Sequence, residues 1–300
     1  MENKFKLTIA ILTMNRAEQM KEAIESCVLS RLPEKTQFVI VDNASSDSTP
    51  DVVEQLRQTV PYEIVYLRQS ENKGVGGGRN VCFDASEGEY VYFLDDDAQI
   101  APECYDTFFV SSVEYLDNNK SVATLTTDVV DNVFGERKIS VGRTQQIGGL
   151  ACAYTFHGST FFIRRSCFKS PLFVDVMYGA EELSASVDAI DRGYCNVYKP
   201  DVHTNHLPKV DKWNIQTDHI KMLSIGNIYT IKKLKYPWIF RPLLYFAYIS
   251  RIRKNGVKDK VVIKESQKKA AEVYIRNKGV RKIKIRTVIK CFREFGFTTF

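Results

Sequence analysis

The chain has 300 residues, of which 44% are hydrophobic and 26% are charged, and this balance excludes a disordered or fibrous protein. Its net charge of +6 conceals a division, because residues 207–300 contain 23 Lys and Arg but only 6 Asp and Glu. Residues 1–206 are therefore acidic, whereas residues 207–300 are strongly basic. We expect two functional regions with these bounds.

The first hundred residues alternate between short apolar runs typical of strands and segments typical of helices. We expect strands at 7–12, 38–41, 64–67 and 90–94, helices at 16–29 and 51–58, and a third helix that ends near residue 85. This alternation with short connections predicts a mainly parallel α/β sheet flanked by helices. In such sheets, ligands bind at the carboxyl ends of the strands.

Three adjacent carboxylates, Asp95, Asp96 and Asp97, come directly after the apolar strand at 90–94. Neighbouring carboxylates repel one another and lose solvation when they are partly buried. A divalent cation with a preference for oxygen ligands would offset both effects. The alternative is a strand-end turn, where Asp is common for its own conformational reasons.

Two further polar segments fall after strands or between them. Asp42 and Asn43 follow the second strand, and they suit either a turn or hydrogen bonds to a nucleobase. The run N-K-G-V-G-G-G-R-N at 72–80 predicts a glycine-rich loop, although it has the spacing of neither a P-loop nor a dinucleotide site. Its glycines would let the backbone approach a ligand closely, with Arg79 available for a diphosphate or a base.

Beyond the aspartates the pattern becomes mixed. Segments 121–130 and 137–141 predict a small antiparallel element, and 159–163 predicts another short strand. A helix is expected at 181–191, because its apolar residues fall on one face.

Four of the remaining titratable groups could carry chemistry. Glu181 and Glu182 open the helix at 181–191, where they either complement the helix dipole or present a carboxylate as a general base. His203 and His206 follow Pro200 in a predicted loop. A histidine near a carboxylate-bound metal can serve as a further ligand.

The motifs, taken in order, resemble those of the inverting nucleotide-sugar glycosyltransferases of family 2, which have the GT-A fold. The resemblance runs from residue 7 to about residue 206 through strand-D-N-A-S-S-D-S-T, N-K-G-V-G-G-G-R-N, strand-D-D-D, G-A-E-E-L-x(9)-G-Y and P-x(5)-H. It implies an inverting, hexosyltransferase-like enzyme that depends on Mn²⁺ or Mg²⁺. A sugar would pass from a nucleotide-diphosphate donor, in the first instance a UDP-sugar, to a hydroxyl of a glycan or lipid-linked acceptor in cell-surface glycan synthesis.

The resemblance also implies roles for individual residues. The expected nucleotide-binding residues are Thr13, Asp42, Asn43, Arg79, Asp95 and Asp96. The expected metal ligands are Asp97, Asp95 and His206, with Asp97 as the direct ligand and Asp95 nearer the ribose. Glu182 matches the second acid of the family's E-D pair and is the expected base. Because Glu stands here where Asp is commoner, Glu181 stays open as the alternative.

The basic region contains an aromatic segment at 236–248, flanked on both sides by Lys and Arg. Such a segment suits the interface of an anionic membrane, but it also suits packing on the first region with the lysines solvated. We expect a mostly helical extension on a protein that is cytoplasmic or peripheral on the inner face of the cell membrane. This location agrees with seven cysteines that form no C-x-x-C pair, with the absence of a signal-peptide pattern and with the absence of an apolar run of membrane-spanning length.

Three other functions fit the sequence less well. A sugar-phosphate nucleotidyltransferase should carry a G-x-G-T-R-like loop near its N-terminus, which T-M-N-R at 13–16 does not match. A non-catalytic nucleotide binder would have no need of the intact acidic residues. Nucleic-acid binding by the basic region is not expected, because no known module signature is present.

Overall fold

The computed structural model describes residues 4–133, 135–136, 139–208 and 218–300. The strands are β1 (Phe5–Thr13), β2 (Thr36–Asp42), β3 (Glu63–Arg68), β4 (Gly88–Asp95), β5 (Ala98–Ile100), β6 (Val122–Asp131), β7 (Gly135–Glu136), β8 (Val141–Ile147), β9 (Leu150–Ala153), β10 (Thr160–Arg164) and β11 (Cys195–His206). The α-helices are α1 (Ala17–Leu29), α2 (Thr49–Thr59), α3 (Gly74–Ala85), α4 (Phe108–Asn118), α5 (Glu182–Asp191), α6 (Asp218–Lys235), α7 (Arg241–Lys254), α8 (Lys260–Arg276) and α9 (Ile285–Phe295). Short 3₁₀ helices are η1 (Pro102–Cys104), η2 (Arg165–Cys167), η3 (Trp238–Phe240) and η4 (Gly296–Thr299).

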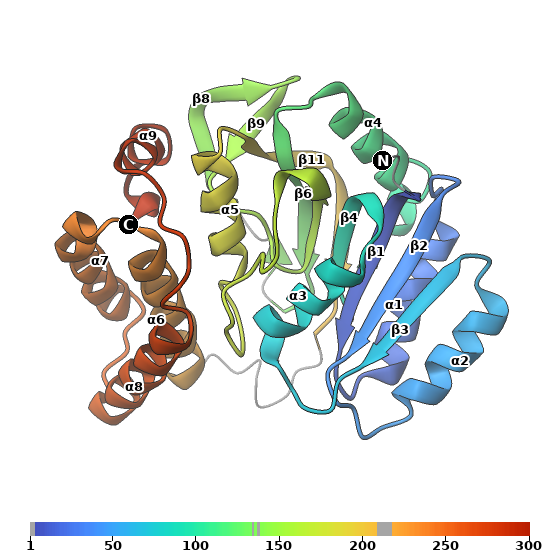
Figure 1. Cartoon of the computed structure of the whole chain (residues 1–300), viewed down its shortest axis with the longest axis horizontal. Helices are drawn as coiled ribbons and strands as arrows, with labels where there is room; N and C mark the ends of the chain where they lie inside the picture. Colours follow the sequence, from blue (N-terminus) through green and yellow to red (C-terminus); the bar gives the residue numbers. More distant parts are fainter. Residues whose placement is uncertain (1–3, 134, 137–138, 209–217) are drawn as a thin grey trace.

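The described strands form one 11-stranded mixed sheet in the order β3-β2-β1-β4-β10-β6-β11-β9-β8, with β5 paired to β11 and β7 paired to β6 (Figure 1). The four strands β3-β2-β1-β4 are parallel, as predicted. Beyond them, β10 lies antiparallel between β4 and β6, and β11 runs parallel to β6. The antiparallel strands that were expected after Asp97 therefore extend the same sheet.

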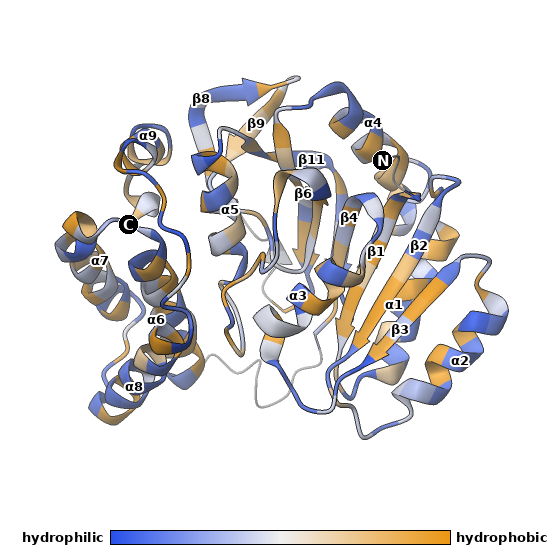
Figure 2. Cartoon of the chain, in the orientation of Figure 1, coloured by the Kyte–Doolittle hydropathy of each residue, from blue (hydrophilic) through white to orange (hydrophobic). Residues whose placement is uncertain are grey.

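Helices cover both faces of the sheet because successive strand residues point to opposite sides. In β1, Leu7 and Ile9 pack on the face that α1, α2 and α4 cover. Ala10 points to the other face, which carries α3 and α5. Figure 2 shows the resulting concentration of hydrophobic residues along β1, β2 and β3.

The glycine run is not a loop, which corrects the sequence prediction. Gly74 begins helix α3, and the remaining glycines of the run lie inside it. A Cβ at Gly76 would lie 2.2 Å from the carbonyl oxygen of Val174, and one at Gly78 would lie 2.5 Å from Cδ1 of Leu12. The glycines therefore let α3 pack closely against β1 and the segment before α5, and this tight packing outweighs their low helix propensity.

The predicted loop around His203 and His206 is also wrong, because both residues lie in strand β11. Pro200 falls where the register between β11 and β6 shifts, between Lys199 and His203. A proline is compatible with a strand at such a bulge. The last residues of β11 then pair with β6 on one side and with β5 on the other.

The strand expected at 137–141 is displaced. Residues 137 and 138 lie outside the described part of the chain, and β8 begins at Val141. β8 and β9 form a hairpin whose turn uses Gly148 and Gly149, with φ of +52° and +85°. Positive φ at both turn positions is the conformation that two-residue hairpins favour.

Helices α6 to α9, with η3 and η4, form what we call the C-terminal helical unit (residues 218–300). Its apolar core includes Ile231 and Val288, and it extends onto Leu183, Val187 and Ile190 of α5. Helix α5 is thus packed between the sheet and the helical unit (Figure 1). Among the described residues, no helix has the length and apolar content that a membrane crossing requires.

Candidate active site

The carboxyl ends of three neighbouring parallel strands carry polar side chains. Thr13 at the end of β1 is paired in register with Asp42 at the end of β2. Asp95 ends β4 on the other side of β1. These three residues therefore lie at the same edge of the sheet.

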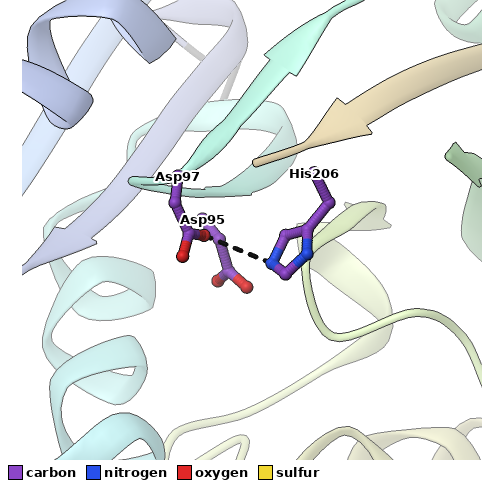
Figure 3. A group of neighbouring side chains, drawn as sticks. All are labelled: Asp95, Asp97 and His206. Atoms are coloured by element: carbon purple, nitrogen blue, oxygen red, sulfur yellow. Dashed lines mark ion pairs between the residues drawn. The ribbon is translucent and has the colours of Figure 1, made fainter. Parts of the chain in front are cut away.

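Asp95, Asp97 and His206 form the acidic cluster at this edge. Each offers a ligand atom, and these atoms lie within 4.8 Å of one another. Figure 3 shows the three side chains directed into one space, with the aspartates at the end of β4 and the histidine at the end of β11. A backbone hydrogen bond holds the two segments together, because the N–H of Leu207 donates to the carbonyl of Asp97 at 2.7 Å.

The histidine is oriented by a residue that the sequence analysis missed. His206 Nδ1 lies 2.8 Å from Asp131 Oδ2, while its Nε2 lies 3.3 Å from Asp97 Oδ1. A carboxylate on one ring nitrogen is the usual way in which a protein orients a metal-binding imidazole through the other nitrogen. Two carboxylates and an oriented imidazole are a donor set that fits Mn²⁺ or Mg²⁺.

Arg16, also missed from the sequence, contacts this cluster at Asp97 and pairs with the neighbouring Asp96 as well. Its Nη1 lies 2.6 Å from Asp97 Oδ2 and 3.0 Å from Asp96 Oδ1. Thr13 donates its hydroxyl to Asp96 Oδ2 at 2.8 Å. Burial raises the pKa of Asp96 to about 7 even though Arg16 opposes the shift. Arg16 thus offsets part of the negative charge of Asp96 and Asp97.

Arg79 is buried and links the acidic cluster to helix α5. It donates to Asp95 Oδ1 at 2.5 Å and to the carbonyl of Gly158 at 2.5 Å, and it forms an ion pair with Glu181. Burial disfavours its charge, but the two carboxylates outweigh that effect and hold its pKa above the ordinary value. Its position supports a linking role, whereas contact with a nucleotide stays a prediction.

The two glutamates before and at the start of α5 have different surroundings. Glu181 is buried, and its Oε1 accepts from Arg79, while its Oε2 has no hydrogen-bond partner among the described residues. Glu182 is half-buried, and no other described residue donates to its carboxylate. Burial and the neighbouring Glu181 raise the pKa of Glu182 to about 8. These surroundings favour Glu182 as the proton acceptor.

The backbone just before Glu181 adopts a left-handed conformation at two successive residues. Ala180 has φ of +70° and follows Gly179, whose φ is +74°. A left-handed conformation is strained for alanine, and such strain is concentrated at functional sites. The turn delivers both glutamates to the N-terminus of α5, next to Arg79.

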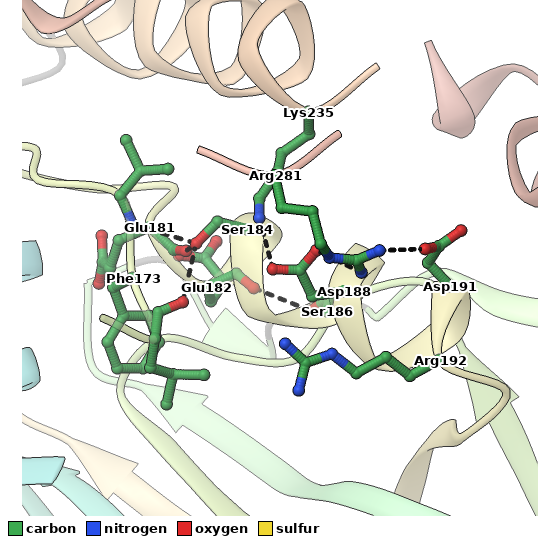
Figure 4. A network of polar contacts seen from close by, with 12 residues as sticks. Phe173, Glu181, Glu182, Ser184, Ser186, Asp188, Asp191, Arg192, Lys235 and Arg281 are labelled. Carbon is green, nitrogen blue, oxygen red and sulfur yellow. Dashed lines mark hydrogen bonds and ion pairs between the residues drawn. The ribbon is translucent and has the colours of Figure 1, made fainter. Parts of the chain in front are cut away.

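The C-terminal helical unit holds the other end of α5 (Figure 4). Asp191 accepts from Arg281 at 2.7 Å, from the N–H of Lys284 at 2.8 Å and from the hydroxyl of Thr287 at 2.6 Å. Asp188 forms ion pairs with Lys235 and Arg281. The helix that carries the glutamates is therefore fixed by charged contacts as well as by the apolar core.

Of the other residues singled out in the sequence, Asp42 and Asn43 make structural contacts, and His203 lies outside the acidic cluster. Asp42 accepts from the N–H of Ser45 and from the hydroxyl of Tyr66, each at 2.7 Å. Asn43 accepts from the N–H of Lys73 at 2.9 Å, which ties β2 to the start of α3. His203 pairs with Glu103 at 3.1 Å, and it is not part of the acidic cluster. Binding of a nucleobase by Asp42 or Asn43 stays a prediction.

The sheet order, the acidic end of β4 and the glutamates at α5 together define a protein of the GT-A class of glycosyltransferases. The fold of *Staphylococcus aureus* TarS (residues 1–349) is similar, with a TM-score of 0.63 at 18% identity over 95% of this chain and 83% of that chain. The mannosyltransferase PcManGT from *Pyrobaculum calidifontis*, solved with GDP-Man and Mn²⁺, gives 0.58 at 16% identity over 95% and 78%. Both likenesses concern the fold alone.

The chain belongs to glycosyl transferase family 2, whose model matches residues 8–169. The resemblance seen in the sequence is thereby confirmed. An uncharacterized glycosyltransferase of *Nostoc* is 39% identical over 92 residues, or 31% of this chain and 28% of that protein. The GalNAc(5)-diNAcBac-PP-undecaprenol beta-1,3-glucosyltransferase of *Campylobacter jejuni* is 32% identical over 95 residues, or 32% and 30%. These matches span less than a third of the length of either relative.

Proposed function

We propose that this protein is a metal-dependent, inverting glycosyltransferase that moves a sugar from a nucleotide-diphosphate donor to an acceptor hydroxyl. Family membership supports the reaction class. The observation that carries the proposal is the chain of contacts from Asp95 of the acidic cluster through Arg79 to Glu181, the residue before Glu182. It connects the residues that could hold a cation to the start of α5, where the pKa of Glu182 is raised to about 8.

The acidic cluster would hold the cation through Asp95, Asp97 and His206. A bound Mn²⁺ or Mg²⁺ would supply positive charge to a diphosphate leaving group. Asp131 keeps the His206 ring in place, and Thr13 and Arg16 fix Asp96 beside it. The protein thereby provides a rigid, mostly buried set of acceptors at the edge of the sheet where ligands bind in this kind of fold.

Glu182 would act as the general base. One of its carboxylate oxygens takes the proton from the acceptor hydroxyl while the hydroxyl oxygen forms a bond to the anomeric carbon. The bond from that carbon to the diphosphate breaks in the same step, so the configuration inverts and no protein nucleophile is needed. Arg79 acts as a positioning residue, because it holds Glu181 and Asp95 in fixed relation to one another.

The names of relatives indicate the class of acceptor. One matched relative acts on an undecaprenol-linked glycan, and another, TarS of *S. aureus*, is a poly(ribitol-phosphate) beta-N-acetylglucosaminyltransferase. TarS has also been solved in complex with UDP-GlcNAc. We therefore propose a UDP-sugar as donor and a glycan or lipid-linked acceptor of the cell surface, encountered at the inner face of the cell membrane.

A thermal-shift panel of UDP, GDP, dTDP and CMP, each with Mn²⁺ or with EDTA, tests the donor half of the proposal. A ligand present at about 100 times its dissociation constant adds roughly 2.7 kcal/mol to the stability of the folded state. We expect one nucleotide to raise the melting temperature only when the metal is present. Asp97→Ala should abolish that shift, whereas His203→Ala, outside the cluster, should retain it.

Turnover tests the catalytic half. Release of nucleoside diphosphate from the donor selected by the panel should require a glycan or lipid-linked acceptor. Metal-dependent nucleotide binding without any turnover would favour a non-catalytic binder. Release of pyrophosphate from a nucleoside triphosphate and a sugar phosphate would instead show a nucleotidyltransferase.

A further inference from the structure

The outer face of η3 and α7 is apolar and exposed. Helix α7 packs on α6 through Leu244, Tyr248 and Ile252, which recur at helical spacing along its inner face. On the outside, Trp238 of η3 is 71% exposed and Phe246 of α7 is 70% exposed. Figure 1 shows α7 at the outer edge of the helical unit, away from β1 to β3. The aromatic segment noted in the sequence thus divides into a packed half and an exposed half.

Helix α9 presents a second exposed apolar stripe. Ile285, Ile289 and Phe292 lie at i, i+4 and i+7 and are 46%, 42% and 38% exposed. The cations Arg286, Lys290 and Arg293 are each one residue further along and form a parallel exposed stripe. An apolar stripe flanked by cations is the pattern of helices that lie in the plane of a membrane interface.

Aromatic ring contacts join these two surfaces. Phe292 of α9 contacts Phe297 at 5.4 Å and Phe300 at 5.6 Å between ring centroids. Phe300 in turn lies 5.9 Å from Phe240 of η3. Phe297 is 74% exposed, so it extends the apolar stripe of α9.

The charges around this surface indicate what covers it. Exposed cations follow on α7 at Arg241, Arg253 and Lys254. Residues 207–300 carry 23 Lys and Arg against 6 Asp and Glu, whereas the rest of the chain is acidic. Large aromatic side chains amid cations match the headgroup region of an anionic bilayer, which takes up aromatic rings and attracts Lys and Arg.

We propose that the outer faces of η3 and α7, together with the exposed stripe of α9 and Phe297, form a docking surface for an anionic lipid bilayer. A second copy of the chain fits this surface less well, because a symmetric contact would bring two strongly basic faces together. Docking here would leave the acidic cluster at the edge of the sheet, on a different part of the molecule, accessible to donor. The interaction does not require that the chain transfer sugar.

Flotation of the full-length protein with vesicles tests the surface. We expect binding to vesicles of phosphatidylcholine with about 30% phosphatidylglycerol, weaker binding to pure phosphatidylcholine, and a decline as salt rises. Trp238→Ala with Phe246→Ala should lower the partition coefficient by about tenfold or more, because two large aromatic groups no longer enter the interface. Leu29→Ala with Val261→Ala is the matched control, since these exposed apolar residues lie on α1 and α8.

Fluorescence locates the contact on the protein. The chain has two tryptophans, and Trp213→Phe leaves Trp238 as the single reporter; Trp213 itself lies outside the described residues. We expect a blue shift of Trp238 emission with anionic vesicles and quenching by brominated lipid. Unchanged melting temperatures of all variants would show that lost binding is not lost folding.

Three results would overturn the proposal. One is equal vesicle binding by the Trp238/Phe246 variant and the unsubstituted chain. Another is emission from Trp238 that does not respond to anionic vesicles. The third is a dimer by light scattering, without lipid, that the same double substitution dissociates, which would assign the surface to a second copy.

Discussion

Replacing Glu182 by Gln should separate donor binding from transfer. The amide keeps the shape of the carboxylate, but it cannot accept the proton of the acceptor hydroxyl. General-base catalysis contributes typically about 10²- to 10⁴-fold, so kcat should fall by roughly that factor. The metal-dependent thermal shift with nucleotide should persist, because the acidic cluster is untouched. Glu181→Gln is the informative comparison, since Glu181 is paired with Arg79.

The pH dependence gives this prediction a magnitude. Burial and the neighbouring Glu181 raise the pKa of Glu182 to about 8. At pH 7 only about a tenth of the Glu182 population would be ionised, and at pH 9 about nine tenths. The value of kcat/KM should therefore rise roughly ninefold between these two pH values. Initial rates over this range, with donor and metal held saturating, measure the effect.

The free energy of unfolding should also depend on the titration of Glu182, and the direction of this dependence follows from its raised pKa. The pKa of Glu182 in the folded protein lies above its ordinary value of 4.5, so the folded state binds this proton more tightly than the unfolded state does. The contribution of Glu182 to stability is therefore present at low pH and is lost as pH rises through about 8. The Gln side chain does not titrate. Between about pH 4.5 and pH 8, the free energy of unfolding of Glu182→Gln should therefore rise relative to that of the unsubstituted protein by at most about 1.4 kcal/mol per pH unit.

The reasoning about Glu182 would be refuted by one combination of results. These are normal transfer by Glu182→Gln and a rate that stays flat between about pH 6 and pH 9. Loss of transfer in Glu181→Gln alone would assign the base to Glu181.

The remaining predictions concern the scaffold and the cluster. Gly76→Ala should destabilise the protein by about 1–3 kcal/mol in urea unfolding, because its Cβ would meet a backbone carbonyl, whereas Gly77→Ala, whose Cβ would meet only side-chain atoms, should cost less. Asp191→Ala removes the acceptor of three hydrogen bonds from the helical unit, and it should cost about 3 kcal/mol and lower the melting temperature. His206→Ala should raise the Mn²⁺ concentration that the nucleotide thermal shift requires by about tenfold or more, with His203→Ala unchanged.

Strands and helices with a clear local pattern of apolar residues could be predicted from the sequence. The strand before Asp95 is mostly β-branched or aromatic and it ends in carboxylates, so both its burial and the place of these carboxylates at its carboxyl end follow from the sequence. The helix at Glu182 was visible in the spacing of Leu183, Val187 and Ile190. The order of the motifs then indicated the family, which the family model confirms.

Contacts between distant residues could not be predicted in the same way. The glycines of α3 resemble a loop when they are considered alone, and only the carbonyl of Val174 beside Gly76 explains them. Arg16 contacts Asp97, which is 81 residues away. The one available signal was its position just after the first strand, on the same edge as the aspartates.

The packing of the chain does not follow the boundary between its acidic and basic regions. Charge separates residues 1–206 from 207–300, but the apolar core of the helical unit includes Leu183 and Val187 of α5. The same helix presents Glu182 at one end and is tied at the other end through Asp191. Removal of the basic region would expose this apolar face and leave the charge of Asp191 without its partners. The basic region therefore belongs to the scaffold that positions the proposed base, whatever else it binds.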